Sequence, residues 1–250
     1  PLPKLAPTKI GELGKKARFR IHPDTTIVMT QPETDVLFAA DALEMERGDR
    51  LLFTGLTFRA PAGTLVRLAG ANGTGKTSLL RLLTGLMMPD EGRVLYRGED
   101  IKTLKEDYWR DLVYIGHLNG VKDDLTAREN VRINARFGNL TVTDEAAEAA
   151  LTKVGLEGFF DHTTGELSQG QRRRVALARL FVSDAKPVWI LDEPFTALDV
   201  ASVANLTKVV ADHVNAGGVV IYTTHQECDV PVADEKKLTV TVSDFAPVLT

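Results

Sequence analysis

The residues best suited to chemistry in this chain form a glycine-rich segment that ends in a lysine and a threonine. Segment 70–77 reads Gly70-Ala71-Asn72-Gly73-Thr74-Gly75-Lys76-Thr77, which matches the pattern G-x-x-x-x-G-K-[ST]. Glycines let the backbone curl with its N–H groups toward phosphate oxygens, and a helix beginning near Lys76 adds the positive end of its dipole. Lys76 supplies a positive charge for the β- and γ-phosphates, and the Thr77 hydroxyl is suited to ligate Mg²⁺. The segment predicts a nucleoside triphosphate site, whose expected phosphate-binding residues are Asn72, Gly73, Thr74, Gly75, Lys76, Thr77 and Ser78.

Two adjacent carboxylates supply the other groups that such a site needs. Residues 188–191 are all apolar, and Asp192 and Glu193 follow them directly. Asp192 is expected to hold the water shell of the Mg²⁺, and Glu193 to be the base that polarises the attacking water. A solvated turn is the alternative for an Asp-Glu pair. The four apolar residues before the pair favour the end of a buried strand.

A parallel sheet is the frame that would bring these groups together. Residues 64–69 predict a short buried strand before the glycine-rich segment, and residues 78–83 predict a helix after it. Residues 188–191 and 219–223 are apolar on both faces, which is typical of interior strands of a parallel sheet.

Three further segments predict β-structure outside these interior strands. Residues 51–58 alternate in the manner of a strand pair, and residues 61–63 form a Pro-Ala-Gly turn. Residues 237–242 alternate as an exposed strand. The fold class is therefore α/β with a mixed sheet core.

A long helical stretch separates the first interior strand from the later ones. Residues 143–145 are a plausible helix start, and Gly155 suits a helix stop. We expect a helical subdomain at about residues 118–182, inserted into a catalytic domain that spans residues 36–250.

Composition and charge exclude several classes of protein. The 250 residues are 44% hydrophobic and 26% charged, as in ordinary globular proteins, which excludes a disordered or fibrous chain. No apolar run reaches the roughly 18 residues that a membrane-spanning helix needs. The net charge of −4 provides no overall basic field, so no nucleic-acid partner is expected. The single cysteine, Cys228, excludes a zinc or iron–sulfur cage built on cysteines.

The first residues differ in charge from the rest of the chain. Residues 1–28 hold six basic and two acidic residues, a balance of +4 that leaves −8 for the remainder. We expect residues 1–35 to be an N-terminal extension that lies on the surface. A remnant of an organelle-targeting sequence and an internal start at Met29 are the alternatives.

A second motif points to one family of nucleotide-binding proteins. Segment 167–174 reads Leu167-Ser168-Gln169-Gly170-Gln171-Arg172-Arg173-Arg174, and its serine lies 24 residues before Asp192. This segment closely resembles the LSGGQ signature of ABC-transporter ATPases, where the spacing is the same. Segment 197–199, Ala-Leu-Asp, resembles the D-loop of that family, and His225 resembles its switch histidine. The resemblance extends over residues 36–242.

The resemblance implies a mechanism. In this family two ATPase copies hold two ATP molecules head to tail, so that each site is completed by the signature loop of the other copy. ATP and Mg²⁺ are the implied cofactors, and His225, Glu193 and Lys76 the implied catalytic residues. The implied nucleotide contacts from the signature and D-loop segments are Ser168, Gln169, Gly170, Gln171 and Asp199.

For the arginines that follow Ser168 and for His225, a functional role is weighed against an ordinary structural one. The N–H groups at the start of a helix bind anions, which suits Ser168 and the residues after it to a γ-phosphate. We expect the three arginines at 172–174 to form a solvated helix face rather than to take part in catalysis. For His225, the alternative to a contact with the γ-phosphate is an ordinary position on the protein surface.

The chain departs from the family pattern at two positions. His117 stands where the Q-loop glutamine is expected, and an imidazole could still bind a metal-bound water or the γ-phosphate and change its charge near neutral pH. The aromatic residue expected to stack on adenine is absent, and Arg47 could lay its guanidinium plane on the base instead.

Within the family, the chain most resembles the ATPase subunits of the haem-handling complex of cytochrome c maturation. The strings carrying this resemblance are segments 79–86, 189–197 and 223–226. It implies CcmB-like, CcmC-like and CcmD-like membrane subunits, a second ATPase copy, and indirectly a CcmE-like haem chaperone. The implied location is the cytoplasmic face of a bacterial inner membrane or the matrix face of a mitochondrial one, with contacts to the membrane subunits around residues 117–129.

Three other functions are weighed against this one. The chain could serve another small-molecule ABC exporter. A soluble ABC-type ATPase acting on nucleic acid would usually carry paired cassettes or basic patches, and neither is visible in the sequence. A P-loop kinase would need a site for a substrate hydroxyl rather than the signature loop and Glu193.

Overall fold

The computed structural model describes residues 19–20, 36–225, 228–246 and 248–249. The expected extension at residues 1–35 therefore lies outside the described residues, apart from strand β1 (Phe19–Arg20). This strand pairs antiparallel with β11 (Val248–Leu249).

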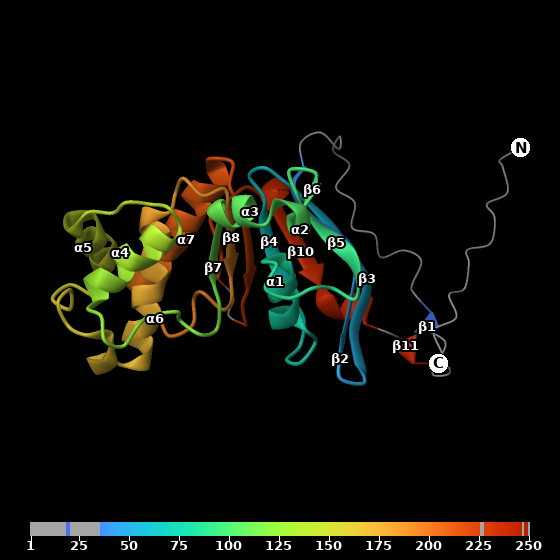
Figure 1. Ribbon diagram of the computed structural model, residues 1–250, viewed down its shortest axis with the longest axis horizontal. Helices are drawn as coiled ribbons and strands as arrows, with labels where there is room; N and C mark the ends of the chain where they lie inside the picture. The colour runs from blue at the N-terminus through green and yellow to red at the C-terminus, as the bar shows by residue number, and fades with distance from the viewer. Residues whose placement is uncertain (1–18, 21–35, 226–227, 247, 250) are drawn as a thin grey trace, which may run out of the picture.

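A five-stranded parallel sheet forms the centre of the chain (Figure 1). Its strands, in order across the sheet, are β10 (Lys237–Thr241), β4 (Leu65–Ala69), β9 (Val219–Thr223), β8 (Val188–Leu191) and β7 (Leu112–Ile115). Every residue of β8 and β9 is buried, so the prediction of interior parallel strands is confirmed. Because all five strands run in the same direction, the residues after their carboxyl ends meet at one edge.

A smaller antiparallel sheet has the order β3-β2-β5-β6. Its strands are β2 (Val36–Arg47), β3 (Arg50–Pro61), β5 (Glu91–Tyr96) and β6 (Glu99–Asp100). The prediction of a strand pair within residues 51–58 is wrong, because these residues belong to the single strand β3. Gly55, with φ of 67°, forms a bulge rather than a turn: β3 has one more residue than β2 between the pairs Leu43–Leu56 and Met45–Phe53.

Helix α1 (Lys76–Leu83) packs between the two sheets. One apolar core joins its buried leucines to Phe58 of the antiparallel sheet and to Val66 and Ile190 of the parallel sheet. Two short helices, α2 (Ile101–Leu104) and α3 (Glu106–Arg110), follow the antiparallel sheet. The start of α1 is thereby held against the edge where the parallel strands end.

Three helices between β7 and β8 make up the helical subdomain: α4 (Ala127–Phe137), α5 (Asp144–Lys153) and α6 (Gln169–Ala178). Their side chains pack on the opposite face of the parallel sheet, around Val113, Trp189 and Val220. Thr143 is the N-cap of α5 and accepts a hydrogen bond from the Ala146 backbone, which confirms the predicted helix start. The boundaries of 118 and 182 stay a prediction.

Helix α7 (Val200–Asn215) precedes β9 and covers the same face of the sheet. Four 3-10 turns complete the regular structure of the described residues, at Thr164–Glu166, Arg179–Val182, Asp234–Lys236 and Val242–Phe245. Within this part of the chain, no helix has the length and apolar character needed to cross a membrane.

A buried histidine at the end of α7 makes the fold sensitive to acid. The His213 ring stacks on Trp189 with centroids 3.8 Å apart, and its Nε2 atom is buried without a hydrogen-bond partner. Gly218 makes this packing possible, because a Cβ there would lie 2.1 Å from Nε2. Burial lowers the pKa of His213 to about 4, although the Pro187 carbonyl and Asp184 act in the opposite direction.

We predict that His213 reduces the stability of the fold as the pH falls. The unfolded histidine binds a proton near pH 6.5 and the folded one only near pH 4, so stability is complete above 6.5 and is lost between these values. The contribution amounts to about 2 kcal/mol between pH 7.5 and pH 5. Urea unfolding of the wild type and of His213→Gln at both pH values measures it. Equal pH dependence in the two proteins would contradict the prediction.

Candidate active site

The glycine-rich segment forms a loop between β4 and α1, as its sequence context requires. Gly70, Gly73 and Gly75 have φ values of 141°, 79° and 98°, which a side chain rarely permits. At Gly75, the N-cap of α1, a Cβ would also lie 3.3 Å from atoms of Leu52 and Phe53 in β3. The loop is therefore held between the antiparallel sheet and the start of the helix.

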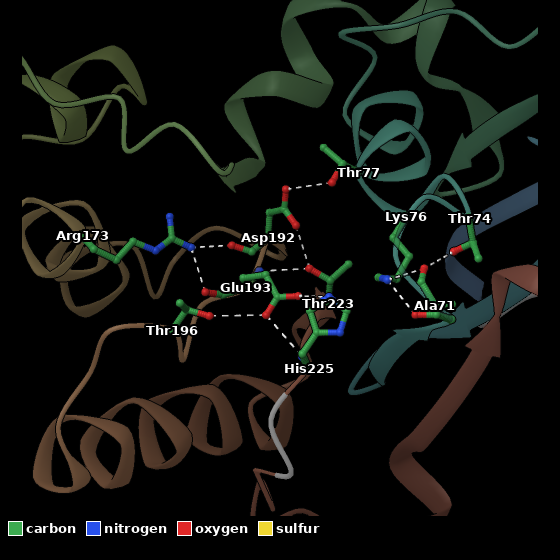
Figure 2. Close-up of polar contacts among 11 residues, drawn as sticks. Ala71, Thr74, Lys76, Thr77, Arg173, Asp192, Glu193, Thr196, Thr223 and His225 are labelled. Atoms are coloured by element: carbon green, nitrogen blue, oxygen red, sulfur yellow. Dashed lines mark hydrogen bonds and ion pairs between the residues drawn. The ribbon is translucent and has the colours of Figure 1, made fainter. Parts of the chain in front are cut away.

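The lysine of this loop points back into the loop itself (Figure 2). The Lys76 ammonium donates to the carbonyls of Gly70 at 2.7 Å and Ala71 at 3.0 Å, and only 8% of the residue is exposed. The hydroxyl of Thr74 donates to the same Ala71 carbonyl at 2.9 Å. The positive charge thus lies inside the ring of backbone that would surround a phosphate chain.

A chain of hydrogen bonds joins the start of α1 to the ends of β8 and β9. The Thr77 hydroxyl lies 3.3 Å from one oxygen of Asp192, and the Thr223 hydroxyl donates to the other oxygen at 2.7 Å. The same Thr223 oxygen accepts from the backbone N–H of Glu193 at 3.0 Å. Asp192 is 3% exposed, so these contacts replace the water that its carboxylate loses on burial.

Glu193 lies in a backbone conformation that is unusual for its type. Its φ is 51°, in the left-handed region that favours glycine. Its carboxylate accepts from the backbone N–H of His225 at 3.3 Å and from the Thr196 hydroxyl at 3.4 Å. The His225 Nε2 atom lies 3.4 Å from the other carboxylate oxygen, with the histidine half exposed. The predicted base and the predicted switch histidine are therefore neighbours.

Magnesium fits the oxygen atoms gathered here. Mg²⁺ in proteins is typically held by one or two carboxylates together with substrate phosphates and water. The Thr77 hydroxyl and the Asp192 carboxylate offer such a partial set, next to the loop that would hold the phosphates. Among the residues that the structure describes, no group of three or more His, Cys, Asp or Glu side chains is arranged to bind a metal by itself.

The signature segment lies at the start of α6 in the helical subdomain. Ser168 is the N-cap, and its hydroxyl accepts from the Gln171 backbone while the Gln171 side chain accepts from the Ser168 backbone. Gln169 and Gly170 open the helix, where backbone N–H groups have no partner within the helix. In the described part of the chain, no hydrogen bond joins residues 168–171 to the glycine-rich loop of the same chain.

Asp199 has a structural contact in addition to its predicted role. It is the N-cap of α7 and accepts from the Ser202 backbone at 2.8 Å, which lowers the pKa of its carboxyl below the usual range. Arg174 of α6 lies 3.3 Å from the same carboxylate. The D-loop and the signature helix are therefore in contact within one chain.

The prediction of a solvated helix face at residues 172–174 is wrong, most clearly for Arg173. This side chain is only 7% exposed and donates to the backbone carbonyls of Gly116, Asp192 and Glu193. Burial lowers the pKa of its guanidinium, and the two nearby carboxylates oppose that shift. The helical periodicity of α6 turns this one arginine toward the sheet.

His117 and Arg47 lie at the surface. His117 is exposed after the end of β7, and in the described residues it makes no hydrogen bond to Thr77 or Asp192. Arg47 is exposed at the end of β2, in the hairpin whose other strand contacts Gly75. The structure brings neither side chain into contact with the carboxylates.

Sequence reasoning missed Thr223, Thr196 and Arg173. The sequence held a signal for the position of Thr223. The apolar residues 219–223 end at Thr223, as the apolar residues 188–191 end just before Asp192, and neighbouring parallel strands end at the same edge of the sheet. Thr196 is close to Glu193 in sequence but carries no motif of its own. No local signal distinguishes Arg173 from the arginines beside it.

Comparison with known proteins identifies related sequences. The profile of the family described as ABC transporter matches residues 53–196. The chain is 46% identical over 202 residues to the cytochrome c biogenesis ATP-binding export protein CcmA of Dechloromonas aromatica, covering 81% of this chain and 98% of that protein. It is 46% identical to the protein of the same name from Escherichia coli K12, covering 82% and 97%.

Solved structures with the same fold are ATP-binding proteins. A putative ABC transporter ATP-binding protein from Pyrococcus furiosus has a TM-score of 0.70 and 22% identity, covering 84% of this chain and 98% of that chain. A dimeric ATP-binding cassette in a post-hydrolysis state, bound to ADP and Pi, has a TM-score of 0.68 and 23% identity, covering 82% and 94%. At these identities the likeness establishes the fold alone, and it confirms the predicted fold class.

We predict that Thr223→Val slows hydrolysis of a bound nucleoside triphosphate about tenfold while changing its affinity by less than about twofold. Valine keeps the shape of the side chain but removes the hydroxyl that bonds both Asp192 and the Glu193 backbone. Thr223→Ser restores the hydroxyl and should recover most of the rate. Phosphate release and nucleotide titration measure the two quantities. Equal rates for the valine and serine variants would contradict the role of the hydroxyl.

Proposed function

The chain belongs to the ABC transporter family, and from this membership we propose that it is the ATP-hydrolysing subunit of a complex that drives haem delivery or release of a haem-loaded chaperone in cytochrome c biogenesis. The observation that carries the proposal is the match to nearly the full length of proteins named CcmA, at 46% identity. As an ABC-type ATPase, the chain converts ATP and water to ADP and phosphate.

Nucleotide binding is assigned to the loop at residues 70–77. Its backbone N–H groups and the dipole of α1 favour the negative phosphates. The Lys76 ammonium, already inside the loop, would exchange its carbonyl partners for β- and γ-phosphate oxygens. Asn72 and Ser78 are proposed as further phosphate contacts, and Arg47 as the group that lies on the adenine ring.

Thr77 and Asp192 would hold Mg²⁺, with His117 as a further candidate through a bound water. When bound, Mg²⁺ neutralises phosphate charge and orients the γ-phosphate. The proposal is supported by the 3.3 Å contact between the Thr77 hydroxyl and the Asp192 carboxylate. The hydrogen bond from the Thr223 hydroxyl to the other oxygen of Asp192 supports this orientation of the carboxylate.

Hydrolysis is assigned to Glu193 and His225. The Glu193 carboxylate would accept a proton from the attacking water, and His225 would contact the γ-phosphate. The proposal is supported by the proximity of the two side chains, 3.4 Å between Nε2 and a carboxylate oxygen. The left-handed backbone of Glu193 sets the direction in which its side chain leaves the end of β8.

The signature residues 168–171 would bind the ATP held by a second copy. The open N–H groups at Gln169 and Gly170, the Ser168 hydroxyl and Gln171 would face its γ-phosphate, with Asp199 near the same interface. This arrangement is supported by the position of the signature on the helical subdomain, without a hydrogen bond to the loop of its own chain in the described residues. ABC ATPases of this kind work as pairs on membrane subunits.

Membrane subunits are proposed to dock on the helical subdomain and the segment after β7. Leu118 is 83% exposed and Phe137 79% exposed, so both offer apolar surface to a partner protein. The proposed partners are CcmB-like, CcmC-like and CcmD-like subunits, acting on a CcmE-like chaperone. The chain would then be peripheral, on the cytoplasmic face of a bacterial inner membrane or the matrix face of a mitochondrial one.

We predict that Glu193→Gln abolishes turnover but binds ATP and accumulates as a dimer. Removing the base stops hydrolysis, so the ATP that joins the two copies persists. In the same background, Ser168→Arg should prevent the dimer without weakening ATP binding to each chain, because its effect falls on the site of the other copy. Light scattering and nucleotide titration measure both. A Glu193→Gln protein that still hydrolyses ATP would refute the assignment of the base.

We predict that the chain copurifies with membrane subunits and that Leu118→Asp with Phe137→Asp removes them without changing ATP binding. Affinity purification from solubilised membranes, followed by mass spectrometry, identifies the subunits. Recovery of exporter subunits unrelated to cytochrome c maturation would favour another ABC exporter. Recovery with nucleic acid and no membrane subunit would contradict the proposal.

A further inference from the structure

Arg173 connects two parts of the chain that the proposed mechanism treats separately. It lies on α6, the helix that the signature segment opens, and its side chain crosses to the edge of the parallel sheet (Figure 2). There one guanidinium nitrogen donates to the Gly116 carbonyl at 2.8 Å, and the other donates to the Asp192 and Glu193 carbonyls, the latter at 3.1 Å. One side chain therefore holds the backbone after β7 and after β8 together.

The neighbouring arginines do not make this connection. Arg172 donates to the Gly165 and Leu167 carbonyls, next to the signature itself. Arg174 donates to the Gly155 carbonyl and contacts Asp199. The three arginines are consecutive and of the same type, so they differ only in the direction in which each side chain leaves the helix.

The contacts of Arg173 bear directly on the proposed catalytic base. The carbonyls of Asp192 and Glu193 fix the two peptide planes around Glu193, whose φ of 51° is strained for a residue with a side chain. A strained conformation persists only where its surroundings hold it. Without the guanidinium, the carbonyls of Asp192 and Glu193 would lose a charged donor. The strained Glu193 backbone would then be left with its uncharged hydrogen bonds to Thr223 and Thr196.

The same helix begins at the residue proposed to face the nucleotide of the second copy. Ser168 and Arg173 are five residues apart, about 7.5 Å along the axis of one continuous helix. A shift of the N-terminus of α6 toward the second copy's ATP would therefore shift the guanidinium and the carbonyls that it binds. The connection runs from one ATP site to the other through a single chain.

We propose that Arg173 is a positioning residue that couples two events: binding of the signature helix to the partner's ATP, and the orientation of Glu193 in its own subunit. The proposal rests on the proposed function, because it requires the head-to-tail pair. It assigns no chemistry to Arg173, which acts on the base through the backbone carbonyls of Asp192 and Glu193, and whose other hydrogen bonds go to the Gly116 carbonyl and the Asn119 side chain. Its consequence is cooperative hydrolysis, in which filling one site prepares the catalytic base of the other.

The test compares Arg173→Met, Arg173→Lys and the matched control Arg172→Met, each as the full chain. For Arg173→Met we expect kcat to fall about tenfold, ATP affinity to change less than about twofold, and the Hill coefficient of hydrolysis to fall from about 2 toward 1. Lysine keeps the charge but not the two-armed donor, so its kcat and Hill coefficient should be intermediate. Arg172→Met should keep the wild-type Hill coefficient.

Thermal unfolding and nucleotide binding verify that each variant is folded. If Arg173→Met does not fold, Arg173→Lys carries the test, and it must lower the Hill coefficient relative to Arg172→Met. Arg173 variants whose kcat and Hill coefficient equal those of Arg172→Met, with the wild type still forming ATP-dependent dimers, would overturn this inference alone. A wild type that hydrolyses ATP without forming pairs would overturn the proposed dimer mechanism and this inference with it.

Discussion

The buried carboxylate of Asp192 is the constraint on which the rest of the site depends. A carboxylate at 3% exposure is tolerable only if hydrogen bonds replace its lost water. The hydroxyl of Thr223 provides one such bond, and the Thr77 hydroxyl lies within reach of the other oxygen. These contacts fix the first turn of α1 and the ends of β8 and β9 relative to one another. The loop that precedes α1 and the glutamate that follows Asp192 are thereby placed in advance, before any nucleotide binds.

The two faces of the parallel sheet serve different purposes. One face packs against α1 and the antiparallel sheet, which supports the glycine-rich loop from behind through Leu52 and Phe53. The other face packs against the helical subdomain and α7, which carry the signature and the D-loop. Because both apolar cores share the same strands, the glycine-rich loop and the signature segment are built on one frame. In the proposed head-to-tail pair, such a subunit would hold parts of two sites and complete neither by itself.

Burial has different consequences for the arginine at 173 and the histidine at 213, because their hydrogen-bond partners differ. Arg173 is surrounded by carbonyls and carboxylates that compensate its desolvation, so its charge can join elements. His213 stacks on Trp189 with an unpartnered nitrogen, so burial keeps it neutral and it contributes packing. Arg173 lies at the edge of the sheet that holds Asp192 and Glu193, whereas His213 stabilises the packing near the end of α7.

The sequence by itself determined the elements whose signals are local. Spacing, periodicity and capping within a few residues predict the glycine-rich loop, the interior strands 188–191 and 219–223 and the helix start at Thr143. The alternation in residues 51–58 predicts two strands but does not show which strand they pair with, and the structure pairs them all with β2 as the single strand β3. The role of Arg173 was equally hidden, because residues 172–174 are identical in type. Only the tertiary structure decided which arginine faces the sheet, since its partners lie 19 to 57 residues away in the chain and are brought within reach by folding alone.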